Sequence, residues 1–300
     1  MMKIYGLGNA LIDIEFSISE QDLIGVGIPK GGMKNISSKE KEFLLKKFKD
    51  CEISRTPGGS IANSLSAAAL YGATASFSCS IGKDKDGIEF LKSLKGLDIF
   101  TKYCEKPTGV CFILITPDGE RTMASCLDAN LALTPKCLDE NKLIQSNIFI
   151  FDSFAIGTNN GFRTVKKSIQ IANSNGVEIC YGVADKSLIQ LNLEKISWLM
   201  SQNIKYVYGN ELEIKELTKS LPVRALNILT TFGDKGASIG NIHVDAKPIS
   251  PVNTNGAGDA FIGVFLALKD KYNKKEALQR ATDYATEICK INGPRMKNAT

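Results

Sequence analysis

From about residue 37 onward, short apolar runs alternate with longer segments of helical periodicity. The apolar runs carry little polar alternation and are found at 75–81, 148–151, 177–183, 205–208 and 226–231. Such runs are typical of strands that are buried on both faces, and these strands occur mainly in parallel sheets. The sequence therefore predicts an α/β fold with a central, mostly parallel sheet covered by helices on both faces.

The helical segments carry recognisable end signals. The pattern predicts helices over 39–49, 60–71 and 162–173. Ser37 or Ser38 can cap the first helix, because a serine hydroxyl accepts a bond from an unpaired N–H group there. Gly72 ends the second helix, since glycine readily adopts the left-handed conformation that is common after a helix.

Two stretches, 12–33 and 109–127, interrupt this alternation. The second contains the turn Pro117-Asp118-Gly119 between two strand-like flanks. We expect the two stretches to form a small antiparallel β lid. Because the chain has no linker rich in Pro, Gly or Ser and no internal repeat, we expect residues 1–300 to form a single α/β domain that includes this lid.

The composition excludes several classes of partner. The 37 basic and 32 acidic residues are spread along the chain, so the net charge of +5 does not predict nucleic-acid binding. The eight cysteines form no C-x-x-C pair and are interpreted as free thiols in a reducing compartment. Without a leader-like start or a long apolar run, we expect a cytoplasmic protein that does not bind membranes.

Other catalytic classes lack their motifs. The chain has no Walker A sequence, and its start, with Gly6 and Gly8, lacks the third glycine of a dinucleotide-binding fingerprint. His243 is the only histidine and lies in a probable strand pair, where a structural role is expected. The cysteines also lack the spacing of a Cys/His metal site.

One segment carries a candidate for phosphoryl chemistry. Gly256, Ala257 and Gly258 precede an apolar helical run, and a helix start favours anions through its unpaired N–H groups and its dipole. Asp259 follows, where its carboxylate can accept the proton of an attacking hydroxyl, with an ordinary or slightly lowered pKa expected. Taken alone, the pattern favours a tight turn with an N-capping aspartate over a phosphate site.

Four ordered motifs resemble those of the PfkB, or ribokinase-like, carbohydrate kinase family. They are the second signature at 253–259, the first signature at 57–63, the first strand at 8–13 and the N-x-x-E motif at 209–213. The resemblance covers nearly the whole chain. It implies a ribokinase-like three-layer sandwich and an ATP- and Mg²⁺-dependent kinase that phosphorylates the hydroxymethyl group of a ribose-like sugar or a nucleoside.

The resemblance also assigns an acceptor site. It implies that Asp13 holds substrate hydroxyls and that Gly59 and Asn63 close over the same sugar ring. Asn9 and Gly58 belong to the same implied site. Carboxylate, amide and bare backbone groups supply the donors and acceptors that a sugar needs at several angles.

A second group of residues is implied to hold the nucleotide. The resemblance places Asn210, Thr231, Gly233 and Gly236 beside ATP and gives Glu213 the role of organising Mg²⁺. Oxygen ligands suit this hard cation. Without the resemblance, Glu213 is a first-turn glutamate that stabilises a helix dipole.

The lid and the head of the second signature carry two further residues. The resemblance places Arg121 in the lid, where a guanidinium can approach the transferring phosphoryl group. Asn253 stands where the family usually has Asp, which removes a charge that helps some members hold a monovalent cation. The use of such a cation therefore stays open.

The branch within the family is indicated by similarity at 8–13, 209–211 and 292–295, where the chain resembles adenosine-kinase-like members. Phe16, Phe112 and Phe154 are candidate walls for a nucleoside base, or core residues. The alternative is a non-catalytic sugar- or nucleotide-sensing protein on the same fold. A monomer and a lid-mediated homodimer are both compatible with the sequence.

Overall fold

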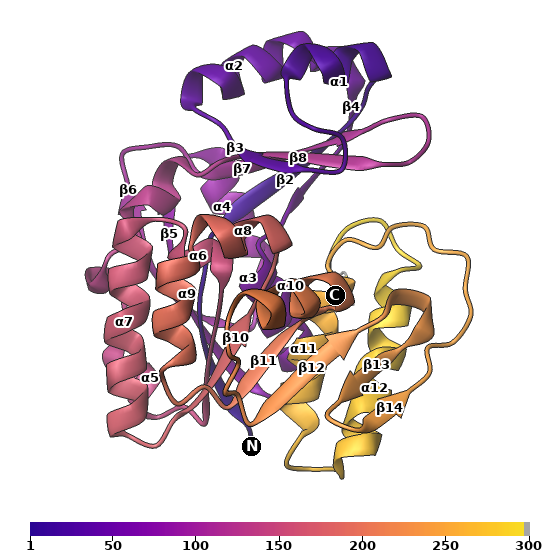
Figure 1. Ribbon diagram of the computed structural model, residues 1–300. Helices are drawn as coiled ribbons and strands as arrows, with labels where there is room; N and C mark the ends of the chain where they lie inside the picture. Colours follow the sequence, from indigo (N-terminus) through magenta and orange to yellow (C-terminus); the bar gives the residue numbers. More distant parts are fainter. Residues whose placement is uncertain (297–300) are drawn as a thin grey trace.

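The computed structural model describes residues 1–296 and contains two sheets (Figure 1). The larger sheet has the order β14-β13-β12-β11-β10-β9-β1-β5-β6, and its strands are parallel from β12 to β6. The strands are β1 (Lys3–Leu7), β5 (Thr74–Gly82), β6 (Asp98–Cys104), β9 (Ile148–Asp152), β10 (Glu178–Gly182), β11 (Tyr206–Asn210), β12 (Asn227–Thr231), β13 (Ala237–Ile239) and β14 (Ile242–Val244).

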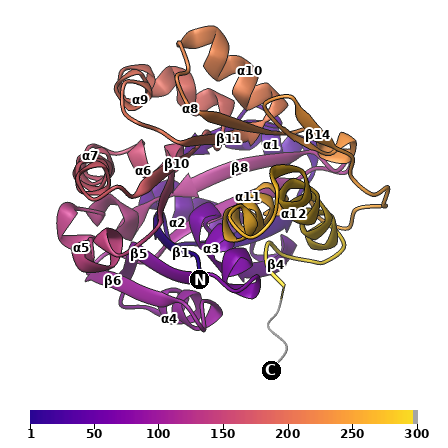
Figure 2. The same cartoon turned by 90° about the horizontal axis from the view of Figure 1, so that it is seen from below.

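Helices cover both faces of this sheet, as the views in Figures 1 and 2 show. One face carries α3 (Ser60–Leu70), α4 (Lys85–Ser93), α11 (Ala257–Leu268) and α12 (Lys274–Ile288). The other carries α5 (Glu140–Ile144), α6 (Ser153–Ile156), α7 (Asn159–Ser174), α8 (Lys186–Leu191), α9 (Leu193–Met200) and α10 (Glu211–Ser220). The arrangement confirms the expected three-layer α/β sandwich.

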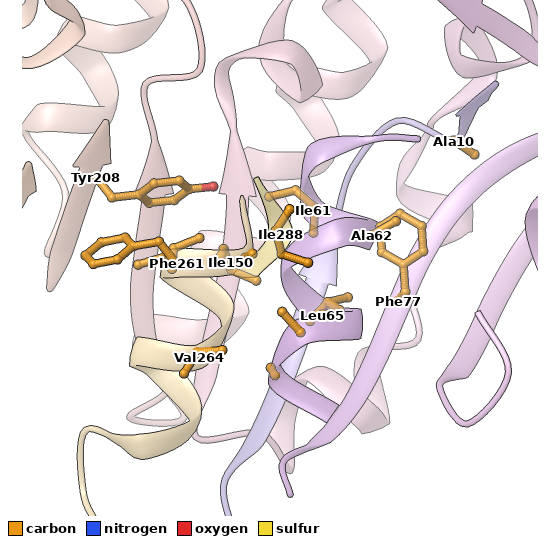
Figure 3. Close-up of a cluster of buried hydrophobic side chains, with 14 of the residues drawn as sticks. Ala10, Ile61, Ala62, Leu65, Phe77, Ile150, Tyr208, Phe261, Val264 and Ile288 are labelled. Atoms are coloured by element: carbon orange, nitrogen blue, oxygen red, sulfur yellow. The ribbon is translucent and has the colours of Figure 1, made fainter. Parts of the chain in front are cut away.

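Alternate side chains of the central strands enter two separate hydrophobic cores. Ile148 and Ile150 of β9 belong to the core beneath α3 and α11, whereas Phe149 between them belongs to the core beneath α7 and α9. Figure 3 shows part of the first core, in which Ile150 lies near Leu65 of α3 and Phe261 of α11. Because both faces are covered, these strands read as continuous apolar runs.

The smaller sheet, called the lid sheet below, has the order β3-β8-β7-β2-β4. Its strands are β2 (Leu11–Ser17), β3 (Met33–Asn35), β4 (Glu52–Pro57), β7 (Gly109–Ile115) and β8 (Arg121–Cys126). The helices α1 (Glu20–Val26) and α2 (Ser38–Lys47) lie on its outer side (Figure 1).

The lid sheet differs from the expected antiparallel lid in two respects. β2 pairs with β4, and β7 with β8, in the antiparallel sense, but β2 pairs with β7, and β3 with β8, in the parallel sense. The chain enters β2 and β7 directly from the parallel strands β1 and β6, which gives both the same direction. β4 lies outside the expected stretches because it is a half-exposed edge strand with charged residues and no apolar run.

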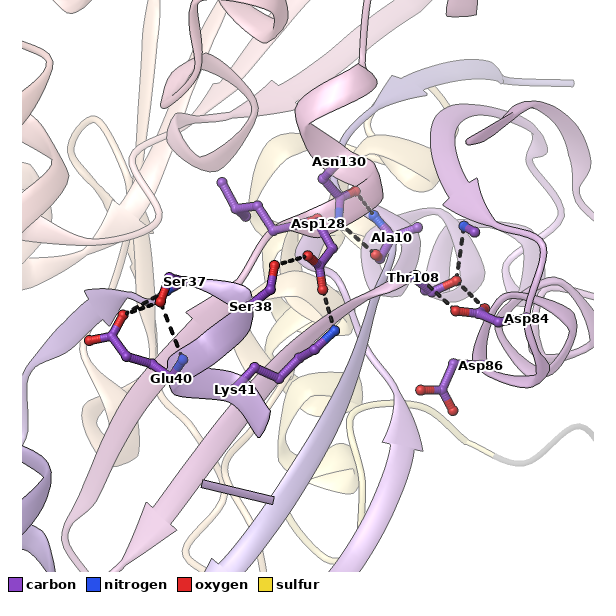
Figure 4. Close-up of polar contacts among 12 residues, drawn as sticks. Ala10, Ser37, Ser38, Glu40, Lys41, Asp84, Asp86, Thr108, Asp128 and Asn130 are labelled. Carbon is purple, nitrogen blue, oxygen red and sulfur yellow. Dashed lines mark hydrogen bonds and ion pairs between the residues drawn. The ribbon is translucent and has the colours of Figure 1, made fainter. Parts of the chain in front are cut away.

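The junction between the lid sheet and the rest of the chain is tied by side chains that follow β8 (Figure 4). Asp128 accepts a hydrogen bond from the Ser38 hydroxyl at 2.8 Å and forms an ion pair with Lys41, both on α2. The Asn130 amide bonds both the N–H and the carbonyl of Ala10, at 2.8 and 2.9 Å. These contacts fix the start of β2, and with it the position of Asp13.

The expected helices are confirmed, with ends that differ from the expected ones by at most three residues. Ser37 caps α2 and forms a capping box with Glu40, and Thr158 caps α7. Short 3₁₀ turns complete the described chain at η1 (Lys49–Cys51), η2 (Asp128–Ala132), η3 (Pro135–Cys137) and η4 (Gly233–Lys235). All eight cysteines are free thiols, as expected. Within residues 1–296, no helix has the length and apolarity needed to cross a membrane.

Candidate active site

A cavity of about 110 Å³ lies between the lid sheet and the carboxyl ends of β1 and β9. In open α/β sheets this edge is the usual place for ligands. The cavity brings together predicted residues from three distant parts of the chain: Asn9, Asp13, Gly59, Asn63 and Asp259 all line it. The structure thus places most of the expected acceptor residues around one space beside the expected base.

Asp259 lies in the first turn of α11, and its Oδ2 accepts a hydrogen bond of 2.8 Å from the Asn63 amide. Burial raises the pKa of Asp259 to about 7, against the lowering effects of Asn63 and Arg295 and with further raising by Asp152 and Asp13. The expected ordinary or lowered pKa is therefore wrong, since desolvation outweighs the hydrogen bond from Asn63 and the charge of Arg295. A base with this pKa is well matched to neutral pH.

The turn before Asp259 has the geometry of an anion site. Gly256 is the N-cap of α11 with φ of 77°, and no side chain caps the helix. The first helical bond runs from Ala260 N–H to the Gly256 carbonyl at 2.8 Å, and Ala257 N–H makes a long bond of 3.3 Å to the Thr254 carbonyl. The amides of Gly258 and Asp259 lie at the open end of the helix. A Cβ at Gly258 would meet nothing within 4 Å, so a phosphate has room to approach the backbone.

Asp13 faces the same cavity from β2. Its Oδ2 accepts a bond of 3.3 Å from the Asn255 amide, and burial raises its pKa to about 6. Gly58 lies directly against this carboxylate, and a Cβ there would collide with both oxygens. Gly59 has φ of 87°, a conformation that favours glycine at the start of α3. Both glycines of the first signature are thus required by close approach or backbone conformation.

Arg121 lies at the start of β8 and contacts the head of the second signature. Its Nη1 donates to Asn253 Oδ1 at 2.9 Å, and the Asn253 amide nitrogen donates to Glu15 Oε1 at 3.2 Å. Asn253 Oδ1 also accepts from Asn255 N–H at 2.8 Å, which shapes the turn. The Asn253 side chain therefore connects Arg121 and Glu15 of the lid sheet to the glycine turn that precedes α11.

This arrangement gives a physical reason for asparagine at position 253. We expect Asn253→Asp to lower the free energy of unfolding by about 1 kcal/mol, because it replaces a donor to Glu15 by a second carboxylate. Adding Glu15→Gln should recover most of that loss. Denaturant unfolding of the four proteins in this cycle measures the coupling, and equal effects of Asn253→Asp in both backgrounds would refute it.

The predicted nucleotide residues gather at the carboxyl ends of β11 and β12, where Asn210 and Thr231 are paired neighbours. Gly233, in η4, has φ of 61° and open space around its Cα, and Gly236 has φ of 93°. The Glu213 carboxylate accepts bonds from Asn210 N–H at 2.9 Å and from its side-chain amide at 2.7 Å. The first of these bonds and a bond of 3.0 Å from Glu213 N–H to Asn210 Oδ1 form a capping box on α10.

Sequence reasoning missed the pocket residue Asp152 and left open whether three phenylalanines are pocket walls or core residues. Asp152 ends β9, lines the cavity and has its pKa raised to about 7 by burial. Of the three phenylalanines considered as walls, only Phe154 lines the cavity. Phe16 and Phe112 are fully buried and pack edge-to-face at 5.5 Å inside the lid sheet core. Their strand positions point them away from the cavity, which a single apolar run does not reveal.

Comparisons with known proteins agree with this architecture. The pfkB family of carbohydrate kinases matches residues 40–298. The deoxyribokinase of Salmonella typhi is 26% identical, with 69% of this chain and 72% of that protein covered. Adenosine kinase 1 of Arabidopsis thaliana is 24% identical over 94% of this chain and 92% of its own. The crystal structure of adenosine kinase from Sinorhizobium meliloti superposes with a TM-score of 0.91, at 23% identity, covering 98% and 96% of the two chains.

The family match and the kinase names of the relatives define the class as a phosphotransferase with an alcohol group as acceptor. The chain belongs to the pfkB family of carbohydrate kinases. It is therefore a sugar or nucleoside kinase, and membership of this family implies the use of ATP and Mg²⁺. The relatives carry different acceptor names, so the acceptor of this chain has to be argued from its own pocket.

Proposed function

We propose that this kinase transfers the γ-phosphoryl group of ATP to the hydroxymethyl group of a ribose-like sugar or nucleoside, with an adenosine-like nucleoside favoured. One observation carries the proposal. Asp259, hydrogen-bonded to Asn63, lies both on the acceptor cavity and at the open helix start formed by Gly256, Ala257 and Gly258. A hydroxyl in the cavity and a phosphate at the helix start would therefore meet at this carboxylate.

The lining of the cavity supports a nucleoside over a free sugar. Its polar side, with Asn9, Asp13, Asn63 and Asn255, suits the hydroxyls of a pentose. The cavity is also lined by apolar groups from the lid sheet, from the turn after β8 and from the helices after β9 and β10: Met33, Ile113, Met123, Leu127, Phe154 and Leu188. A heterocyclic base would cover these groups, whereas a free pentose would leave them facing water.

The residues divide the work of the transfer. The acceptor oxygen attacks the γ-phosphorus, its proton passes to Asp259, and the bond between the γ-phosphorus and the β,γ-bridging oxygen breaks as ADP leaves. The amides at Gly256, Ala257 and Gly258 hold the developing phosphate charge. Arg121 supplies a further positive group from the lid sheet. Asp13 fixes the sugar, so that the hydroxymethyl group stays aligned with Asp259.

The nucleotide and its metal are assigned to the neighbouring end of the sheet. Asn210, Thr231, Gly233 and Gly236 would contact ATP, since they meet at the carboxyl ends of β11 and β12. Glu213 would hold Mg²⁺ through water, because each of its oxygens accepts one bond from Asn210 and keeps a second lone pair. Bound Mg²⁺ would offset the phosphate charge, and phosphate oxygens and water would complete its coordination.

The proposal is tested by incubating the purified protein with ATP-Mg²⁺ and separate acceptors: adenosine, inosine, ribose, deoxyribose and fructose. We expect kcat/KM for adenosine to exceed that for ribose by at least about tenfold, because the base covers apolar wall. Thermal shifts with the same panel are recorded in parallel. Stabilisation by a ligand without any phosphorylated product would replace the kinase by the sensor alternative, and ribose outperforming adenosine would reject the nucleoside assignment.

A further inference from the structure

Arg295 lies beyond α12, in a segment that returns to the edge of the acceptor site. Its guanidinium donates through three nitrogens: Nε to Asn63 Oδ1 at 2.6 Å, Nη1 to Ser93 Oγ at 2.8 Å and Nη2 to the Gly58 carbonyl at 2.5 Å. The group also lies 5.8 Å from the centre of the Phe90 ring. The segment is thus fastened to α3, to α4 and to the turn before α3.

The bond to Asn63 fixes which way that amide faces. Asn63 Oδ1 accepts from Arg295, and Asn63 Nδ2 donates to Asp259 Oδ2 at 2.8 Å. If the amide were reversed, its NH₂ group would face a guanidinium donor and its oxygen would face a carboxylate. Both contacts would be repulsive. Arg295 therefore imposes the one orientation in which Asn63 supports the ionised form of Asp259.

Arg295 also brings positive charge to a group of buried carboxylates. Asp259 faces Asp13 and Asp152, whose charges raise its pKa, while Arg295 lowers it. Burial raises the pKa of Tyr208 on β11, and the charges of Asp152 and Asp259 raise it further. Burial lowers the pKa of Arg295 to about 10, which leaves the guanidinium protonated at neutral pH. The other guanidinium near the site, Arg121, is bonded to Asn253.

We propose that Arg295 is a positioning residue for the transfer: it orients Asn63 toward Asp259 and places a positive charge near this buried carboxylate. The proposal rests on the proposed function, since it gives Asp259 the role of base. Arg295 contacts neither acceptor nor nucleotide in this scheme. It acts through its hydrogen bond to Asn63 and through the electrostatic effect of its positive charge on Asp259. Its removal should therefore change the pH dependence of the reaction.

The test compares Arg295→Gln, Arg295→Lys and Ser93→Ala with the wild type. For Arg295→Gln we expect the acid limb of kcat/KM to move up by roughly one pH unit and kcat at pH 7 to fall about tenfold. Arg295→Lys keeps the positive charge, so its acid limb should match that of the wild type. Its kcat should recover only in part, because one ammonium group cannot make the three hydrogen bonds of the guanidinium to Asn63, Ser93 and Gly58. Ser93→Ala loses one bond of the fork and should leave the profile unchanged.

A second measurement does not depend on turnover. Carboxyl carbons of ¹³C-labelled aspartate are titrated by NMR in the wild type and in Arg295→Lys and Arg295→Gln, with Asp259→Asn used to assign the resonance. A higher pKa of Asp259 in Arg295→Gln, restored in Arg295→Lys, supports the inference even if no acceptor is ever phosphorylated. An unchanged pKa of Asp259 or an unchanged acid limb of kcat/KM in a folded Arg295→Gln overturns the inference. Arg295 would then have only a structural role. If Arg295→Gln does not fold, Arg295→Lys alone still tests the inference. A shift of about one pH unit in the acid limb of kcat/KM in Arg295→Lys, which keeps the positive charge, would overturn it.

Discussion

Replacing Asp259 by asparagine is expected to lower kcat by about 10³-fold, with a much smaller change in KM for the acceptor. Asparagine keeps the size of the side chain and can still accept the bond from Asn63, but it has no basic oxygen to take the proton of the hydroxyl. Steady-state kinetics at pH 8 measure the effect. Undiminished kcat in this variant would remove Asp259 from the mechanism.

The same variant should be more stable than the wild type at alkaline pH. The pKa of Asp259 is raised by burial from 3.8 to about 7, so between these values the folded state binds more protons than the unfolded state. Stability contributed by this group therefore falls as the pH rises through that window, and the loss is complete above pH 7. We expect Asp259→Asn to gain several degrees in Tm at pH 8 and almost nothing at pH 4.

Asp152→Asn is the matched control. Asp152 is also buried, has a pKa of about 7 and caps α6 through the Ala155 N–H, a bond that asparagine can keep. This variant should gain stability at pH 8 in the same way. Its activity should persist, with the acid limb moved to lower pH because one negative neighbour of Asp259 is gone. Equal loss of kcat in both variants would contradict a specific role of Asp259 as base.

Local patterns were enough to predict the layers of the fold. The continuous apolar runs at 148–151 and 177–183 became β9 and β10, because a strand covered on both faces needs apolar residues at every position. The edge strand β4 was not predictable in this way. Its residues are exposed or half-buried, and their pairing with β2 depends on a sheet that other segments build.

In the candidate site, too, some features are predictable from local sequence patterns and others depend on the rest of the fold. Asp13, Asn63 and Asp259 were predicted through motifs, because each motif records a local backbone geometry. The pKa of Asp259 and the contacts of Arg295 were not, since they arise from groups 36 to 246 residues away that meet only in the fold: Asn63 lies 196 residues from Asp259 and 232 from Arg295. Burial and charge at a site are properties of the assembled neighbourhood, which no local pattern contains.

Gly263 is a second residue whose importance only the packing reveals. It lies on α11 one turn after Asp259, and a Cβ there would collide with the carbonyl oxygen of Ser64, the neighbour of Asn63 on α3. The two helices therefore cross with their backbones in close approach at this glycine. The crossing sets the distance between Asn63 and Asp259, because each lies within one turn of the contact.

We expect Gly263→Ala to lower the free energy of unfolding by about 2–3 kcal/mol and Tm by about 5–10 °C, although alanine favours a helix. The obstacle is backbone, so α3 and α11 must separate, and kcat should fall by up to about 10² as Asn63 moves away from Asp259. Thermal unfolding and kinetics on the same sample measure both effects.

Gly25→Ala provides the matched control on another helix. A Cβ at Gly25 of α1 would meet only the end of the Lys47 side chain, at 3.3 Å, so the helix propensity of alanine should raise stability slightly without changing kcat. If Gly263→Ala behaved like Gly25→Ala, the helix crossing would tolerate a methyl group. The distance between Asn63 and Asp259 would then be set by the Arg295 fork and the glycine turn of the first signature, and not by the contact between α3 and α11.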